Sequence, residues 1–161
     1  MKNQEFITNS FEETQKVGEN FIGSIPAQPG QGYSLSRRKA LVIALYGELG
    51  SGKTTFVQGL AKGLGIKRRI ISPTFIIMRT YEIRFKIYDL RFKNFYHVDL
   101  YRVENVDDIK GLGIEEIIDN PQNIVAIEWA ERIGKLLPKP RVDIYFEYLR
   151  EDKRKIVIKQ L

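Results

Sequence analysis

Apolar residues along this chain follow patterns that predict two kinds of strand. Residues 40–46 and 124–127 form unbroken apolar runs, which are typical of strands buried on both faces of a sheet. Residues 81–87 instead alternate apolar with charged side chains, which indicates a half-exposed strand. Residues 95–102 follow as another strand, so the segment 81–102 is predicted to form an antiparallel hairpin.

Apolar residues at helical spacing predict helices in other parts of the chain. These helices cover residues 10–22, 56–61, 106–109, 114–119 and 130–137. Ser10 and Glu13 form a capping box that marks the start of the first helix, and Pro138 ends the last one. Residues 23–36 are dense in Gly, Pro and Ser, which predicts a surface loop.

Residues 47–55, between the first apolar run and the next helix, match the phosphate-loop pattern G-x-x-x-x-G-K-[ST]. Glycines let such a backbone wrap around a polyphosphate, and the helix N-terminus adds partial positive charge. Lys53 is expected to reach the β- and γ-phosphates, and Thr54 to bind Mg²⁺. The alternative is an ordinary glycine-rich turn with a solvated lysine. We expect a site for ATP and Mg²⁺ formed by Gly47, Glu48, Leu49, Gly50, Ser51, Gly52, Lys53, Thr54 and Thr55.

The strand, loop and helix at 40–62 predict an α/β protein. The second buried run ends at Glu128, and ligands bind at the carboxyl ends of parallel strands. A charged turn near the C-terminus joins two further strand segments into a predicted hairpin. We therefore predict a three-layer, P-loop NTPase-like sheet, mainly parallel, with antiparallel hairpins at 81–102 and 142–159. A single domain is expected over residues 1–161.

Composition narrows the class of protein. Hydrophobic residues make up 43% and charged residues 29% of the 161 residues, which is ordinary for a soluble globular protein. The chain has no cysteine, which excludes disulfides, thiolate metal sites and cysteine nucleophiles. The net charge of +6 favours polyanionic partners such as nucleotides or RNA. No apolar run reaches membrane-spanning length and no signal peptide is evident, so we expect a cytoplasmic protein.

Two acidic residues are candidates for catalysis beside the phosphate loop. Glu128 follows a buried strand and is expected to hold Mg²⁺ or to orient the attacking water. Asp99 also lies near a strand end, and an ion pair with Arg102 is its structural alternative. The catalytic candidates are therefore Glu128, Asp99 and Lys53. The candidate metal ligands are Thr54, Glu128 and Asp99.

For two further residues, a role in packing is favoured over a role in catalysis or ligand binding. His97 is the only histidine and could act as a base, but a histidine in an aromatic strand is more often packed and hydrogen-bonded. Trp129 follows Glu128 directly. We expect it to pack in the core or at the start of a helix, and not to stack on a nucleotide base.

Four short motifs, in their order along the chain, resemble the TsaE (YjeE) family. These motifs are residues 47–56, Ser-Pro-Thr-Phe at 72–75, Tyr-His-Val-Asp-Leu-Tyr-Arg at 96–102 and Ile-Glu-Trp at 127–129. The resemblance covers residues 8 to 149 and includes Glu13-Thr14 and Gly18. It implies a small bacterial P-loop ATPase required for threonylcarbamoyladenosine (t6A) modification of tRNA.

The resemblance also implies roles for individual residues. Lys53 and Thr54 would bind phosphates and Mg²⁺, and Thr14 would lie near the nucleotide. Thr74 would belong to a switch-like loop that senses the γ-phosphate. The two carboxylates named above would lie around Mg²⁺ and the hydrolytic water.

Partners are implied by the resemblance as well. Family members act with TsaB and TsaD, where ATP hydrolysis resets the complex and TsaD performs the threonylcarbamoyl transfer. We therefore expect TsaB, TsaD and tRNA as partners, with tRNA bound directly or through the complex. The segment 84–93 is longer and more basic than the family needs. Its charges either steer association or only protect a strand edge against aggregation.

Two other functions are compatible with the same motifs. A small nucleotide or nucleoside kinase shares the phosphate loop and a strand that ends in Glu. A kinase needs an arginine-bearing lid over the phosphates. After Glu128, the chain offers only Glu131-Arg132 and the predicted hairpin for such a lid, which disfavours the kinase. The aromatic and basic mixture at 81–101 suggests instead an RNA-binding module whose loop merely holds a nucleotide.

Overall fold

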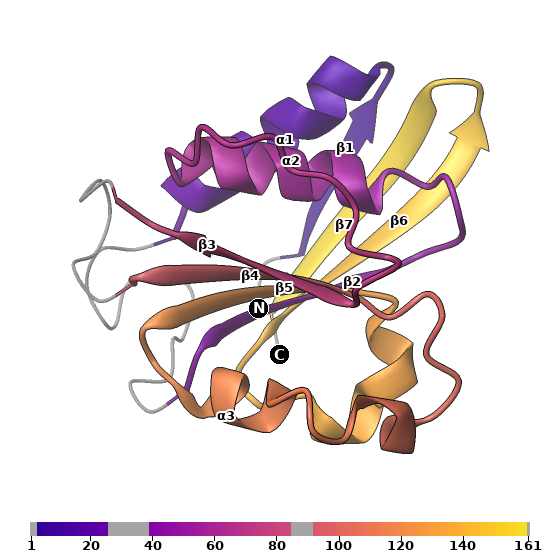
Figure 1. Ribbon diagram of the computed structural model, residues 1–161. Coiled ribbons are helices and arrows are strands. Elements are labelled where there is room, and N and C mark those ends of the chain that lie inside the picture. The colour runs from indigo at the N-terminus through magenta and orange to yellow at the C-terminus, as the bar shows by residue number, and fades with distance from the viewer. Residues whose placement is uncertain (1–2, 26–38, 85–91, 161) are drawn as a thin grey trace.

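The computed structural model describes residues 3–25, 39–84 and 92–160, and its seven strands join one sheet (Figure 1). They are β1 (Gln4–Thr8), β2 (Leu41–Tyr46), β3 (Met78–Glu82), β4 (Asn94–Asp99), β5 (Asn123–Glu128), β6 (Val142–Arg150) and β7 (Lys153–Gln160). Their order across the sheet is β1-β7-β6-β2-β5-β4-β3. β2 pairs in parallel with β5 and β6, and β4 pairs in parallel with β5. The pairs β1–β7, β6–β7 and β3–β4 are antiparallel, so parallel pairing is confined to the centre.

Helices cover both faces of this sheet and complete the predicted three layers. α1 (Phe11–Gly23) and α2 (Lys53–Gly63) lie on one face. α3 (Ile114–Asp119) and the 3₁₀ helices η1 (Val106–Ile109) and η2 (Ala130–Leu136) lie on the other (Figure 1). In the described ranges, no helix is both long and apolar enough to cross a membrane. The α/β class predicted from the sequence is confirmed.

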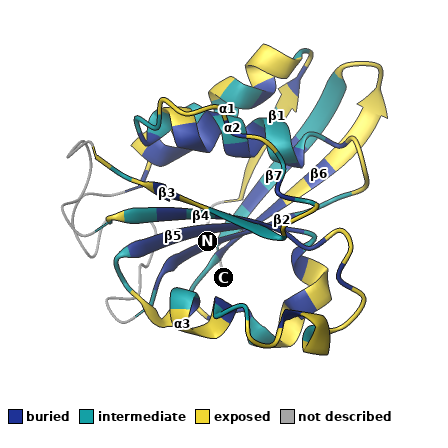
Figure 2. Cartoon of the chain, in the orientation of Figure 1, coloured by how far each residue is buried: buried dark blue, intermediate teal, exposed yellow. Residues whose placement is uncertain are grey.

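The central strand β2 is buried on both faces because its apolar side chains alternate between two cores. Ile43 and Leu45 pack with α1 and α2, whereas Val42 and Ala44 pack with the helices of the opposite face. Figure 2 shows β2 and β5 buried along nearly their whole length. An unbroken apolar run is the sequence pattern that a strand covered on both faces requires.

Two glycines allow α1 and α2 to pack backbone against backbone. A Cβ atom on Gly18 would lie 2.3 Å from the Phe56 carbonyl oxygen. A Cβ on Gly59 would lie 2.0 Å from the carbonyl oxygen of Gln15. Both distances are far below van der Waals contact, and neither neighbour is a flexible side chain. The glycines therefore set how closely α1 approaches the helix that follows the phosphate loop.

The observed hairpins confirm the predicted pairing with shifted boundaries. β3 begins at Met78, earlier than the predicted strand, and ends at Glu82. Arg84, just beyond it, forms an ion pair with Glu82, 3.0 Å from Nε to the carboxylate. The hairpin tip at 85–91 and most of the predicted surface loop, 26–38, lie outside the described residues.

β1 is the element that the sequence pattern does not predict. It has five residues, and only its last residue, Thr8, is fully buried. Phe6 is the residue of this strand that packs against the core, which is too weak a pattern to predict a strand, and β1 forms by pairing with β7 at the far end of the chain. This pairing also brings the start of α1 next to the C-terminal hairpin.

We predict that Gly59→Ala destabilises the protein, because the new methyl group must push the two helix backbones apart. Overpacking of this kind costs about 1–3 kcal/mol, which a urea unfolding curve would detect. Gly134→Ala is the matched control, since a Cβ at Gly134 meets nothing within 4 Å. Equal stability of both variants would contradict the close helix packing.

Candidate functional site

The phosphate loop connects the end of β2 to the start of α2, and its own glycines shape it. Gly47 has φ +145°, and a Cβ there would lie 2.5 Å from the Phe146 carbonyl oxygen. Gly52 precedes α2 with φ +102° and provides no side-chain cap. The first N–H groups of α2 therefore have neither an intrahelical acceptor nor a cap, and they remain available to an anion.

Lys53 lies inside the loop, with only 4% of its surface exposed. Its Nζ donates to the carbonyl oxygens of Gly47 at 2.6 Å and Glu48 at 2.8 Å. The same ammonium lies 4.1 Å from the centre of the Trp129 ring. Burial lowers the pKa of Lys53, although the nearby carboxylate of Glu128 raises it in opposition. The ammonium is thus held in place by the loop before any ligand arrives.

Glu128 and Asp99 end two neighbouring parallel strands, and the register pairs them directly. Both are 3% exposed. Thr54 Oγ1 donates to the Glu128 carboxylate, at 2.8 and 3.0 Å from its two oxygens. The sequence-predicted acids and the loop threonine therefore meet at one edge of the sheet.

Asp99 holds the segment that contains the predicted switch residue. Its Oδ2 accepts hydrogen bonds from Ser72 Oγ at 2.5 Å and from Thr74 Oγ1 at 2.6 Å. Its Oδ1 accepts from the backbone N–H of Tyr101 at 3.0 Å. The ion pair with Arg102, the alternative for Asp99, is not formed among the described residues. Arg102 instead lies over the Phe75 ring.

His97 lies behind Glu128 and does not line the site. It is completely buried, and its Nε2 is 2.8 Å from Glu128 Oε1. An ionised carboxylate can only accept hydrogen bonds, so Nε2 of His97 carries the proton in this pair. Nδ1 is buried and has no hydrogen-bond partner among the described residues. The packed, hydrogen-bonded interpretation of His97 agrees with this geometry.

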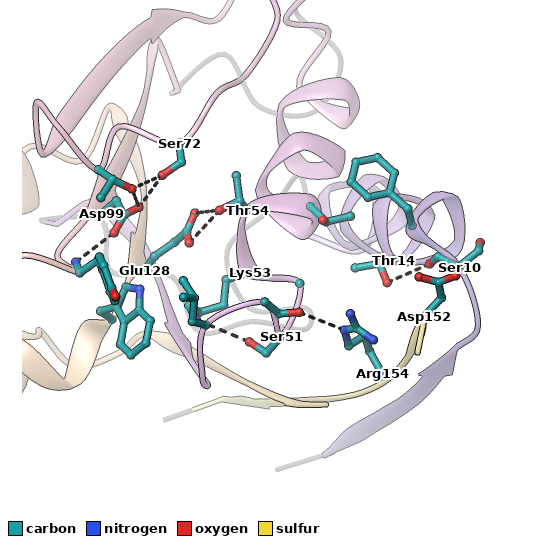
Figure 3. Close-up of a pocket in the computed structure, with 18 residues that line it drawn as sticks. Ser10, Thr14, Ser51, Lys53, Thr54, Ser72, Asp99, Glu128, Asp152 and Arg154 are labelled. Carbon is teal, nitrogen blue, oxygen red and sulfur yellow. Dashed lines mark hydrogen bonds between the residues drawn. The ribbon is translucent and has the colours of Figure 1, made fainter. Parts of the chain in front are cut away.

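These groups surround a cavity of about 410 Å³ (Figure 3). The predicted residues that line it are Thr14, Leu49, Gly50, Ser51, Gly52, Lys53, Thr54, Thr55, Thr74, Asp99 and Glu128. Gly47 and Glu48, the first two residues of the loop, do not line the cavity, and their carbonyl oxygens accept hydrogen bonds from Lys53. The structure therefore brings most of the sequence-predicted residues together around one cavity.

Sequence reasoning missed several residues of the same cavity. Ser10, Phe11, Tyr101, Asp152 and Arg154 line it, and Trp129 faces it although only packing was predicted. Phe11 and Ser10 are close in sequence to Thr14, which is a signal that could have found them. Asp152 and Arg154 belong to the terminal hairpin, and no local pattern places that hairpin beside the phosphate loop.

The donor set suits a magnesium-bound polyphosphate. The described residues contain no group of three or more His, Asp or Glu side chains able to hold a metal alone. Mg²⁺ at such sites is usually held by one or two carboxylates together with the substrate phosphates. Glu128, Asp99 and the Thr54 hydroxyl fit that arrangement, beside a lysine and a helix N-terminus that attract the phosphates.

We predict that His97→Leu lowers the free energy of unfolding by about 1–3 kcal/mol, because Glu128 loses a buried hydrogen-bond donor. Urea unfolding of the single and double variants with Glu128→Met would measure the coupling. The loss of stability caused by His97→Leu should be smaller in the Glu128→Met background than in wild type. If His97→Leu costs the same in both backgrounds, His97 only fills space.

Comparisons with known proteins identify the family of this chain. The family model described as "Threonylcarbamoyl adenosine biosynthesis protein TsaE" matches residues 8–156. The protein named tRNA threonylcarbamoyladenosine biosynthesis protein TsaE from Bacillus subtilis is 35% identical, over 97% of this chain and 85% of its own length. A relative of the same name from Rickettsia bellii is also 35% identical, over 96% and 93%.

A solved structure extends the agreement to the fold. The crystal structure of YdiB from Bacillus subtilis superimposes with a TM-score of 0.68 and 27% sequence identity. The superposition covers 98% of this chain and 84% of that one. The family match thus extends over both the sheet and the phosphate-loop site. This chain belongs to the TsaE family.

Proposed function

We propose that this protein is the ATP-binding and ATP-hydrolysing subunit required for tRNA N6-threonylcarbamoyladenosine modification. Relatives that match this chain over most of their own length are named for that biosynthesis. The observation that carries the ATPase assignment is the contact between Thr54 and Glu128 beside the phosphate loop. We assign the whole chain, residues 1–161, to one ATPase domain, and its place of action to the cytoplasm.

ATP binding would rest on the loop backbone and on Lys53. The phosphates would take the amide N–H groups at the start of α2, where no side-chain cap competes for them. Lys53 is already positioned by two loop carbonyls, so little side-chain entropy remains to be lost on binding. Thr54, Glu128 and Asp99 would hold Mg²⁺, which when bound offsets the negative charge of the phosphates.

Hydrolysis needs a group that orients the attacking water. Glu128 is the candidate, because His97 and Thr54 hold its carboxylate in a fixed orientation at the cavity wall. Asp99 would contribute by holding Ser72 and Thr74 at the site through two short hydrogen bonds. A γ-phosphate that competes for these hydroxyls would release the segment, which gives the switch role a physical basis.

TsaB and TsaD are the partners that we propose, with tRNA bound directly or through their complex. Large apolar side chains are exposed close to the cavity mouth, and Leu49 is 72% and Phe75 82% exposed. Co-purification with TsaB and TsaD, with and without ATP, tests this assignment. Failure to associate in both conditions would overturn it.

A kinase remains the second candidate, because a late arginine does reach the cavity. Arg154 lines it, and its Nε donates to the Gly50 carbonyl oxygen at 3.2 Å. However, it lies at the opposite end from Asp99 and not over the predicted terminal phosphates (Figure 3). Release of inorganic phosphate without an added acceptor would favour the ATPase. Phosphate transfer that depends on a nucleoside or nucleotide would favour the kinase.

We predict that Lys53→Ala weakens ATP binding or slows hydrolysis by about 100-fold or more, since a desolvated positive charge is lost from the phosphates. Binding of a fluorescent ATP analogue and phosphate release would measure both steps. Lys62→Ala is the matched control on the same helix, because its side chain is 67% exposed and pairs with Glu19. Hydrolysis at the wild-type rate by Lys53→Ala would remove this residue from the site.

We predict that Glu128→Gln keeps the ATP affinity within about ten-fold but slows hydrolysis by about 100-fold or more. The amide preserves the shape of the side chain and removes the charge that orients water or metal. Single-turnover phosphate release separates the two effects, with Glu115→Gln on α3 as the control. Loss of binding in a folded Glu128→Gln variant would show that Glu128 has mainly a binding role.

A further inference from the structure

Positive charge is concentrated in the part of the chain that follows α2. Residues 66–84 and 92–102 contain seven Lys and Arg residues against two acidic residues, Glu82 and Asp99. They therefore hold five of the six surplus positive charges of the whole chain. Glu82 already pairs with Arg84, and Asp99 is buried in the phosphate-loop site. Most of this positive charge is thus left without a carboxylate of the same segment.

The fold brings part of this charge to one edge of the sheet. β3 is the last strand of the sheet, and it pairs with β4 alone among the described strands (Figure 1). Arg79 lies on β3, on the same face as the buried Tyr81 two residues later. Arg68 lies between α2 and β3, on a segment that Ile70 anchors in the core beside Tyr81. Gln58 of α2 fixes this segment by donating to the Ile70 carbonyl oxygen at 3.1 Å.

Tyr81 shows that the arginines of the two segments lie close together. Burial raises the pKa of Tyr81, and the positive charges of Arg79 and Arg68 lower it in opposition. Both guanidinium groups therefore act on the same phenol. Arg69 follows directly, and both it and Arg68 are exposed. We call Arg68, Arg69 and Arg79 the arginine edge.

The arginine edge has no internal partner for its charge. In the described part of the chain, none of its three arginines forms an ion pair with a carboxylate. Nε of Arg79 is also buried, and no hydrogen-bond acceptor among the described residues reaches it. A buried donor without an acceptor costs free energy, so folded proteins contain few of them. By contrast, Lys39 pairs with Asp119 and Lys155 with Glu5 on other parts of the surface.

The chemistry of this edge suits the backbone of a nucleic acid. A guanidinium is always charged, and its planar fork donates two parallel hydrogen bonds to a phosphate group. Cations spread along an edge match phosphates that repeat along a strand. RNA is favoured over an acidic protein because all three cations are arginines and because relatives of this chain are named for the modification of tRNA.

We propose that the arginine edge binds the phosphate backbone of RNA. The inference rests on the proposed function in tRNA modification, and it names the surface through which this chain contacts RNA directly. The arginine edge is separate from the ATP cavity, because none of its three residues lines that cavity. RNA binding and ATP binding can therefore be measured independently.

Salt dependence measures how many phosphates this surface contacts. We would titrate a labelled tRNA transcript with wild type and with the triple variant Arg68→Gln, Arg69→Gln and Arg79→Gln, at about 50 to 200 mM salt. Each lost phosphate contact should reduce the slope of log affinity against log salt by about 0.7–0.9, which gives about 2–3 for the triple variant. At about 50 mM salt, the triple variant should bind tRNA about 10- to 1,000-fold more weakly.

A matched triple variant controls for net charge. Lys110→Gln, Lys135→Gln and Lys139→Gln remove three exposed charges on or next to the 3₁₀ helices of the opposite face. This control should bind tRNA within about three-fold of wild type, because salt screens charges that are far from the contact. Both triple variants should keep ATP affinity and phosphate release, and thermal unfolding would check that they fold.

Poly-glutamate tests whether the edge recognises phosphates or any negative charge. It should displace labelled tRNA only at about ten-fold or more higher charge concentration than unlabelled tRNA, because single carboxylates along a flexible chain do not reproduce the phosphate backbone. Equally effective displacement by poly-glutamate would assign the edge to an acidic protein partner and overturn the inference.

Two further outcomes would overturn it. Equal losses of tRNA affinity in both triple variants would show that net charge alone attracts tRNA. Wild-type tRNA affinity in the arginine variant, together with increased aggregation, would show that the arginines protect an exposed strand edge.

The outcomes also separate this inference from the proposed function. A wild-type protein that hydrolyses ATP and co-purifies with TsaB and TsaD, but binds no tRNA at about 50 mM salt, would refute the arginine edge alone. A wild-type protein that neither hydrolyses ATP nor associates with TsaB and TsaD would refute the proposed function.

Discussion

Parallel pairing of β2, β5 and β4 is the constraint on which the rest of the site depends. It aligns three strand ends at one edge of the sheet, so that the phosphate loop, Glu128 and Asp99 meet there. Both acids are almost completely buried, and such charges are tolerated only with hydrogen-bond donors around them. Thr54 donates to Glu128, and Ser72 donates to Asp99. The donors therefore tie the phosphate loop and residues 72–74 to the sheet.

The same contacts link stability with function. The Glu128 carboxylate accepts a hydrogen bond from Thr54 on its cavity side and one from His97 on its core side. A ligand that recruits the Thr54 hydroxyl would leave Glu128 with its His97 contact and its charge directed at the cavity. Asp99 is placed similarly between the backbone of Tyr101 and two hydroxyl groups. The site is thus arranged so that binding would exchange internal hydrogen bonds for contacts with ligand and metal.

Local chemistry explains why much of the fold and part of the site were predictable. The glycines, Lys53 and Thr54 are contiguous, and a phosphate loop between a buried strand and a helix works almost independently of distant residues. The apolar run of β2 also predicted its double-sided burial correctly. Prediction weakened where an element depends on a distant partner. β1 contributes Phe6 to the edge of the core, and its pairing with β7 joins the two ends of the chain.

The sequence by itself determined the phosphate loop, the two strand-end carboxylates, the central strands and the resemblance to the TsaE family. Each of these is carried by neighbouring residues whose spacing has a direct physical meaning. Only the tertiary structure decided that His97 supports Glu128 from the core and that Asp99 holds Ser72 and Thr74 instead of Arg102. It also decided that Arg154 reaches the cavity, because strand order and register are set by packing over the whole sheet.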